Sequence, residues 1–183
     1  MSARTRLLLS NFLIYQIAWF TGVWTAATKQ PWIGAIAMVS AIVIHLVRAP
    51  RREPELALVG IALVIGLLFD SLLVWRGWVH YPSGILIPDL APYWMVLMWG
   101  LFATLLNVTL RWMHGRFIVA ALLGAIGGPA AYYGGVRMGA LQFSDESAAL
   151  IALVVGWAII TPLLMALADR FNGYAHAMEA TPS

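Results

Sequence analysis

The run LALVGIALVIGLLFDSLLVW, residues 56–75, is apolar except for Ser71 and one acidic residue, Asp70. An α-helix rises about 1.5 Å per residue, so this run is about as long as the roughly 30 Å hydrocarbon core of a membrane is thick. A bilayer offers the backbone no water to bond, which leaves a helix as the structure that such a run can adopt. The run therefore predicts a membrane-spanning helix with a carboxyl group inside it.

Five further apolar runs accompany this one, so the whole chain is predicted to be a membrane domain. Hydrophobic residues make up 62% of the 183 residues and charged residues 10%, against about 45 to 50% and about 25% in soluble domains. The expected spans are residues 7–27, 32–47, 56–75, 91–112, 117–136 and 148–168. The first run is longer than a typical signal-peptide core and is expected to be retained. We predict an all-α integral membrane protein, a single bundle of six transmembrane helices over residues 1–183.

The distribution of Lys and Arg predicts which way the bundle faces. With the N-terminus inside, the cytoplasmic side carries eight of the eleven basic residues: Arg4, Arg6, Arg48, Arg51, Arg52, Arg111, Arg116 and Arg170. The outer side carries the other three, Lys29, Arg76 and Arg137. Because positive loops are retained in the cytoplasm during insertion, we predict cytoplasmic N- and C-termini in a multi-pass protein of a bacterial inner membrane. Basic residues at the ends of spans meet lipid headgroups, so the bilayer is the expected partner and nucleic acid is not.

Asp70 is the strongest functional candidate, because a carboxyl group inside a span is costly unless it is paired or protonated. It shares a helix face with Gly66, which would admit another helix closely. Arg137, Tyr132 and Tyr133 are candidate partners at similar depth on the fifth span. Two interpretations stay open: a structural carboxyl held by such a partner, or a group that binds a ligand, moves a proton or takes part in catalysis.

Two further stripes of polar residues run along the first and fourth spans. They consist of Asn11, Tyr15 and Gln16 on the first span, and of Gly100, Thr104, Asn107 and Arg111 at helical spacing on the fourth. If the two spans pack together, the stripes can satisfy each other's hydrogen bonds, at roughly 1 kcal/mol per bond. The alternative is a pocket for a polar ligand between them, with Asn11, Tyr15, Gln16, Asn107 and Arg111 as its candidate residues.

The fifth span carries small residues at every fourth position, Ala120, Gly124 and Gly128. Such a stripe lets another helix approach closely, and a groove of this kind is filled well only by a helix. We therefore expect the fifth helix in the middle of the bundle and not at its lipid-facing edge. A partner membrane protein docking on Gly124 and Gly128 is the alternative occupant of the groove.

The usual catalytic and metal-binding patterns are not found. The chain has no cysteine, no pair of histidines with an intervening acid, no phosphate loop and no acidic pair at metal-ligand spacing. The histidines are single and scattered, at His45, His80, His114 and His176, so we expect no metal site and name no cofactor. One cluster at the outer end of the third span combines an acid, a base and a cation within one helix end and loop. Its members are Asp70, Arg76, His80, Tyr81 and Asp89.

Several short motifs resemble an inner-membrane family of bacteria known as domain of unknown function 2878. They are Asn11-Phe12 with Tyr15-Gln16 and Trp19-Phe20, the segment Gly66 to Asp70, Pro92-Tyr93-Trp94, and the run GAIGGPAAYYGG at residues 124–135. The resemblance spans nearly the whole chain. It implies a role near fatty-acid or envelope-lipid chemistry, and it carries no established activity.

Three functions are compatible with these patterns. The first is a component that binds or transports a small amphiphile, such as a lipid or fatty-acid derivative, between the polar stripes and the aromatic outer rim. The second is a membrane-embedded enzyme, or enzyme subunit, of lipid modification that uses Asp70. The third is a structural or assembly partner of another membrane protein. An apolar cavity reaching Asp70 would favour the first two functions over the third.

Overall fold

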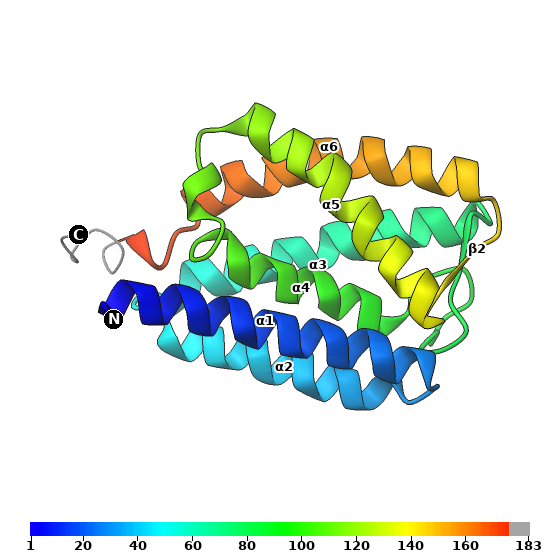
Figure 1. The fold of residues 1–183 in the computed structure, drawn as a ribbon, viewed down its shortest axis with the longest axis horizontal. Helices are drawn as coiled ribbons and strands as arrows, with labels where there is room; N and C mark the ends of the chain where they lie inside the picture. The colour runs from blue at the N-terminus through cyan, green and yellow to red at the C-terminus, as the bar shows by residue number, and fades with distance from the viewer. Residues whose placement is uncertain (176–183) are drawn as a thin grey trace.

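A computed structural model of the chain describes residues 1–175. The expectations placed on His176 and on the C-terminus lie outside these residues. Six α-helices follow one another along the chain (Figure 1): α1 (Ala3–Ala27), α2 (Pro31–Arg48), α3 (Arg52–Trp75), α4 (Tyr93–Leu106), α5 (Phe117–Met138) and α6 (Glu146–Arg170). A short 3-10 helix, η1 (Arg111–Met113), lies between α4 and α5. Two strands of two residues each, β1 (Val79–His80) and β2 (Gln142–Phe143), complete the fold.

All helices except α4 are long and apolar enough to cross a membrane. Large apolar side chains on their outer faces are exposed, for example Ile17, Leu68 and Ile151, each at 66%. Side chains of this kind are expected to face lipid. The expected all-helical architecture is confirmed, and five of its helices suit a membrane protein. Helix α1 begins at the same end of the bundle at which α6 ends (Figure 1).

The fourth helix is shorter than the predicted span 91–112. It ends at Leu106, because the amide of Asn107 is drawn to Glu55 and to the main chain of Phe171, and the chain then turns. Its last carbonyls are taken by other donors: Leu110 N–H bonds Leu105 O at 2.8 Å, and a ring nitrogen of His114 lies 3.0 Å from Leu106 O. The polar stripe is therefore not one helical face, since Asn107 and Arg111 lie beyond the helix end.

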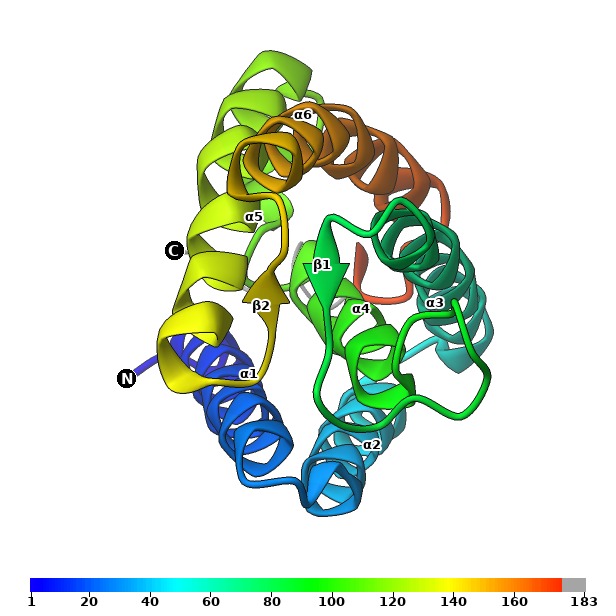
Figure 2. The ribbon, with the colours of Figure 1, turned by 90° about the vertical axis from the view of Figure 1, so that its right-hand side faces the viewer.

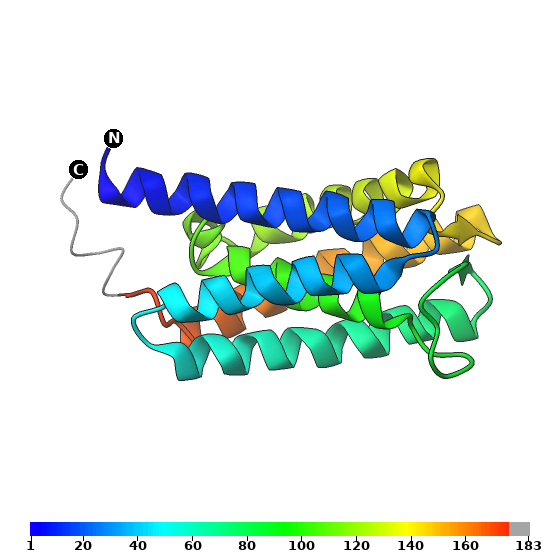
Figure 3. The same cartoon turned by 90° about the horizontal axis from the view of Figure 1, so that it is seen from below.

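Helix α4, and not α5, occupies the middle of the bundle. Seen end on, the other five helices surround it (Figure 2), and most of its side chains are buried. Figure 3 shows α2 between α1 and α3, all three running along the long axis of the molecule. The 14 residues of α4 rise only about 21 Å, less than a hydrocarbon core of roughly 30 Å. A helix enclosed by protein does not need to match the bilayer in length.

The predicted central position of α5 is wrong. Its small residues face one neighbour, α6, while Ile118, Leu122 and Ile126 on the opposite side are 78%, 61% and 68% exposed. The expected close helix contact is confirmed, because a Cβ atom at Gly124 or Gly128 would collide with Trp157 or Thr161 of α6. The glycine face of α5 is therefore covered by α6, and the opposite face is apolar and exposed.

A short antiparallel ribbon joins the loop after α3 to the loop between α5 and α6, at the end of the bundle opposite the start of α1 (Figure 2). Strands β1 and β2 pair antiparallel, with Val79 opposite Phe143 and His80 opposite Gln142. Trp78 extends the ribbon by accepting the N–H of Ser144 at 2.9 Å through its main-chain oxygen. The ribbon fixes the loop after α3, and with it the residue that follows β1, Tyr81.

Candidate functional site

Asp70 lies in the interior of the bundle with no exposed surface and accepts three side-chain hydrogen bonds. The hydroxyl of Tyr132 donates to Oδ1 at 2.6 Å, and the hydroxyl of Tyr81 donates to the same oxygen at 2.9 Å. The indole Nε1 of Trp99 donates to Oδ2 at 2.7 Å. Three uncharged donors from α4, α5 and the loop after β1 therefore satisfy the carboxyl group without a basic side chain.

Two glycines make room for the aromatic rings around Asp70. A Cβ atom at Gly66, one turn before Asp70 on α3, would collide with the ring of Trp99. Trp99 stacks on Trp157 of α6, with ring centroids 4.6 Å apart and planes inclined by 19°. Trp157 in turn lies against Gly128, where a Cβ atom would meet its ring. The small residues of α3 and α5 thus admit two indoles, and one of them carries a donor to Asp70.

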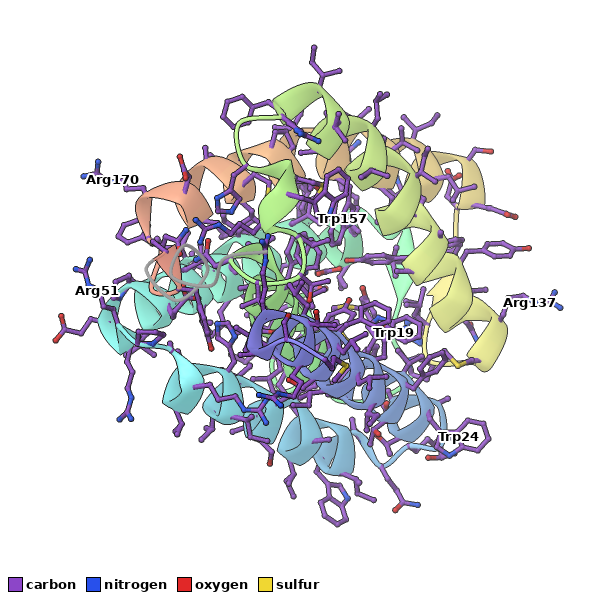
Figure 4. The ribbon with its side chains drawn as sticks, turned by 60° about the vertical axis from the view of Figure 1, so that its left-hand side comes forward. Trp19, Trp24, Arg51, Arg137, Trp157 and Arg170 are labelled. Atoms are coloured by element: carbon purple, nitrogen blue, oxygen red, sulfur yellow. The ribbon has the colours of Figure 1, made fainter. Side chains whose placement is uncertain are left out.

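Of the candidate partners on the fifth span, the structure selects one. Tyr132 binds Asp70, whereas Tyr133 is 46% exposed and faces outward. Arg137 is also exposed and points away from the bundle (Figure 4), so the predicted pairing of Asp70 with this guanidinium is wrong. Successive helical residues point about 100° apart, so neighbours such as Tyr132 and Tyr133 cannot share the inward face.

The predicted outer cluster does not assemble. His80 of β1 and Asp89 of the following loop are exposed, and Arg76 lies over the ring of Trp78 at 4.8 Å. Only Tyr81 from this cluster reaches Asp70. Burial, followed by the charge of the neighbouring Asp70 carboxylate, raises the pKa of Tyr81 well above its usual value, so its hydroxyl stays a donor.

An apolar pocket lies beside Asp70, between α1, α4 and α5. It encloses about 510 Å³ outside the atoms, counting its mouth. Its lining is rich in aromatic side chains, with Trp19 of α1 and Trp157 of α6 pointing inward (Figure 4). The lining residues are Tyr15, Trp19, Val23, Trp94, Met95, Met98, Trp99, Phe102, Ala131, Tyr132, Gly135, Leu141 and Trp157. We call this space the aromatic pocket.

Asp70 does not line the aromatic pocket, but two of its donors do. Trp99 and Tyr132 form part of the pocket wall, while their polar hydrogens are turned onto the carboxyl group. The carboxyl group therefore fixes two aromatic rings from behind, and the polar atoms of both rings are already bonded. A ligand in the pocket would meet apolar and aromatic surface, which is the usual lining of a small-molecule site.

The first span packs on the fourth, which was the condition for the two polar stripes to bond each other. Asn11 Nδ2 donates to the main-chain oxygen of Thr104 at 3.0 Å, and Thr109 Oγ1 donates to Asn11 Oδ1 at 2.6 Å. Tyr15 lines the aromatic pocket, and Gln16 is half-buried beside it. Asn11 thus belongs to the contact between the helices, and Tyr15 belongs to the pocket.

Asn107 and Arg111 belong to a different cluster, near the end of the bundle where α1 begins and α6 ends (Figure 1). Asn107 Nδ2 donates to Glu55 Oε1 at 2.7 Å and to Phe171 O at 2.9 Å, and Arg111 Nη1 donates to Ala175 O at 3.4 Å. The centre of this cluster is Glu55, which has no exposed surface and is not among the candidates that the sequence patterns indicated. Glu55 stands in the first turn of α3, where acidic residues are common at exposed helix N-termini, so its residue type gave no sign of burial.

The histidines also gave little signal in the sequence. His45 binds Glu55, and its Nε2 lies 2.8 Å from Oε2 of that residue. His114 pairs with the exposed Asp169 at 3.3 Å. Among residues 1–175 there is no group of three His, Asp or Glu side chains that could hold a metal ion.

Comparison with known proteins places the chain in a family and assigns it no activity. Neither a curated protein nor a solved structure matches the chain. The family described as "Protein of unknown function (DUF2878)" matches residues 8–163, which include α2 to α5, Asp70 and its three donors, and every residue that lines the aromatic pocket. The chain therefore belongs to the DUF2878 family of proteins of unknown function.

Proposed function

We propose that this protein binds the hydrocarbon chain of an amphiphile, a lipid or fatty-acid derivative, in the aromatic pocket. The observation that carries the proposal is the lining of the pocket, which is apolar and aromatic and lies within a membrane-type bundle. Small-molecule sites are usually lined by side chains of this kind.

Asp70 serves this function as a positioning residue. Its hydrogen bonds from Trp99 and Tyr132 hold these two rings in the pocket wall, and the carboxyl group itself stays out of the ligand's reach. This arrangement favours binding over the alternative of an enzyme in which Asp70 attacks or protonates a lipid, because such a group must touch the reacting atoms. The pocket can hold a lipid for transport or for presentation to a partner, and both uses begin with binding.

The glycine groove of α5 offers less support for an assembly partner. Gly124 and Gly128 are covered by Trp157 and Thr161 of the same chain, so a partner would have to displace α6 to reach them. An amphiphile in the aromatic pocket needs no such displacement.

Native mass spectrometry of the gently purified protein tests the proposal. Ala131 lines the pocket, so Ala131→Phe fills it, and Ile126→Phe adds an aromatic ring to the exposed face of the same helix as a control. We expect a retained lipid or fatty-acid mass on the wild type and on Ile126→Phe, and its loss from folded Ala131→Phe. Wild-type protein without such a mass, or equal retention by both variants, contradicts the proposal.

A further inference from the structure

A second polar site, independent of the aromatic pocket, lies at the end of the bundle where α2 ends and α3 begins. Its centre is Glu55, whose carboxyl group is bonded by three donors. Oε2 meets His45 Nε2 at 2.8 Å, while Oε1 accepts from Asn107 Nδ2 and from the main-chain N–H of Gly173, both at 2.7 Å. His45 is the one ionisable side chain bonded to this carboxyl group among residues 1–175.

Glu55 fixes the orientation of the His45 ring. A carboxylate only accepts hydrogen bonds, so Nε2 carries the hydrogen and the neutral ring presents a lone pair at Nδ1. The ring of Tyr174 packs against this ring, with centroids 5.0 Å apart. Its hydroxyl donates to the main-chain oxygen of His45 and not to a ring nitrogen. Nδ1 is buried and has no hydrogen-bond partner among residues 1–175. A buried polar atom without a partner indicates a missing group, because leaving it unbonded is costly.

A small cavity lies beside His45, between α1, α2 and α4. It is narrow and partly open, with room inside for about one water-sized group, and His45, Arg48, Asn11 and Tyr174 are among its lining residues. Asn11 is already satisfied by Thr104 and Thr109. Arg48, the last residue of α2, donates through Nη1 to Ser10 Oγ at 3.3 Å and has further N–H groups to offer. The cavity thus combines a hydrogen-bond acceptor with a permanent cation.

We propose that this cavity takes a free hydroxyl of an anionic lipid headgroup, whose phosphate lies at the mouth beside the exposed Arg48. The hydroxyl donates to His45 Nδ1, and the phosphate oxygens accept from the guanidinium of Arg48. Arg48 ends a membrane-type helix, which is the depth at which lipid phosphates lie and at which basic pockets between helices bind them. The pair of groups gives a specificity that charge alone would not, because a lipid without a free hydroxyl leaves Nδ1 unbonded.

Nitrogen NMR of the histidine side chains tests this site directly. Protein labelled with ¹⁵N-histidine in uncharged detergent is titrated with short-chain phosphatidylglycerol, which has free hydroxyls, and with short-chain phosphatidylcholine, which has none. We expect phosphatidylglycerol to move the Nδ1 resonance of His45 and phosphatidylcholine to leave it in place. The resonance is assigned with His45→Gln or, should that variant not fold, by elimination with His80→Gln, His114→Gln and His176→Gln.

Matched arginine variants provide the control. Arg48→Gln should weaken the response to phosphatidylglycerol by roughly tenfold, the effect of losing one charge-assisted hydrogen bond, while Arg116→Gln, an exposed cation elsewhere, should leave it unchanged. Equal responses to both lipids, no response to either, or an unchanged response in folded Arg48→Gln overturns the proposal. A response to glycerol 3-phosphate as strong as that to phosphatidylglycerol overturns the lipid assignment in favour of a soluble ligand.

Discussion

Gly66 and Trp99 occupy one shared space at the crossing of α3 and α4. The Trp99 ring lies where a side chain at Gly66 would begin, and from there its Nε1 reaches Asp70 at 2.7 Å. The missing Cβ atom of Gly66 therefore does two things at once. It lets α3 and α4 approach closely, and it lets Trp99 bond the buried carboxyl group.

Gly66→Ala should destabilise the protein by about 1–3 kcal/mol, because Trp99 must move off its bond to Asp70. Gly60→Ala on the same helix meets no atom within 4 Å and should stabilise by about 0.5–1 kcal/mol, the usual helix gain. Unfolding midpoints of both variants in detergent measure the difference. Equal shifts in the two variants would show that the crossing tolerates a methyl group.

Tyr132→Phe should cost about 1–3 kcal/mol of stability, because Asp70 loses its shortest hydrogen bond inside the bundle. Tyr133→Phe removes an exposed hydroxyl one residue along and should change stability by less than about 0.5 kcal/mol. Thermal unfolding of the two variants side by side tests the assignment. A Tyr133 variant as unstable as the Tyr132 variant would contradict it.

Gly124→Leu should abolish folded protein, since the new side chain would collide with the main-chain oxygen of Trp157 as well as with Thr161. Backbone cannot yield as a flexible side chain can, so the two helices would have to separate. Gly127→Leu, where no atom lies within 4 Å, should purify like the wild type. Size-exclusion profiles in detergent decide between folded and aggregated material, and a monodisperse Gly124→Leu protein would refute the tight contact.

Membrane orientation remains a prediction from the distribution of arginine and lysine. The chain has no cysteine, so single cysteines at two exposed positions, Asp89→Cys and Arg116→Cys, can be labelled without background. In intact cells a membrane-impermeant maleimide should label the cysteine at position 89 and spare the one at position 116 until the membrane is opened. The reverse pattern would invert the topology.

Ionisation of Tyr174 should lower the stability of the folded protein measurably at alkaline pH. Burial, followed by the charge of Glu55, raises its pKa above the ordinary value of about 10, so the folded state holds this proton more tightly than the unfolded state. Its contribution is present below about pH 10 and is lost as the pH rises further. The slope of unfolding free energy against pH above 10 should therefore be shallower in Tyr174→Phe, by up to about 1.4 kcal/mol per pH unit. Identical slopes would contradict the shift.

The long apolar helices could be predicted from the sequence because run length and hydrophobicity act locally. The expected spans 7–27, 32–47 and 117–136 agree closely with α1, α2 and α5. The early end of α4 could not be predicted, because it depends on contacts of Asn107 with Glu55 and Phe171, which are distant in the sequence. Hydropathy cannot distinguish a helix enclosed by other helices from one that faces lipid.

The candidate site was predictable where local sequence features indicate it, and not where it depends on contacts between residues distant in the sequence. Asp70 stood out because a lone acid in an apolar run is costly, and helical spacing brought Tyr132 into consideration. Trp99 did not stand out, because a tryptophan is ordinary in an apolar span and only the fold brings its Nε1 to Asp70. His45 and Glu55 are each unremarkable in type and position, and only the folded chain brings Asn107 and Gly173 to the same carboxyl group.

The order of the residues that bond Asp70 has a consequence for biosynthesis. Ribosomes make Asp70 before Tyr81, Trp99 and Tyr132, so its carboxyl group enters the insertion machinery ahead of all three donors. A carboxylate at the centre of a helix costs about 2.5–3.5 kcal/mol on insertion, whereas each leucine, isoleucine, valine or phenylalanine returns about 0.3–0.6 kcal/mol. Helix α3 shares with α6 the highest hydropathy of the long helices. That surplus carries Asp70 into the bilayer, and the set of three hydrogen bonds that holds it in the finished protein is complete only after α5 has been made.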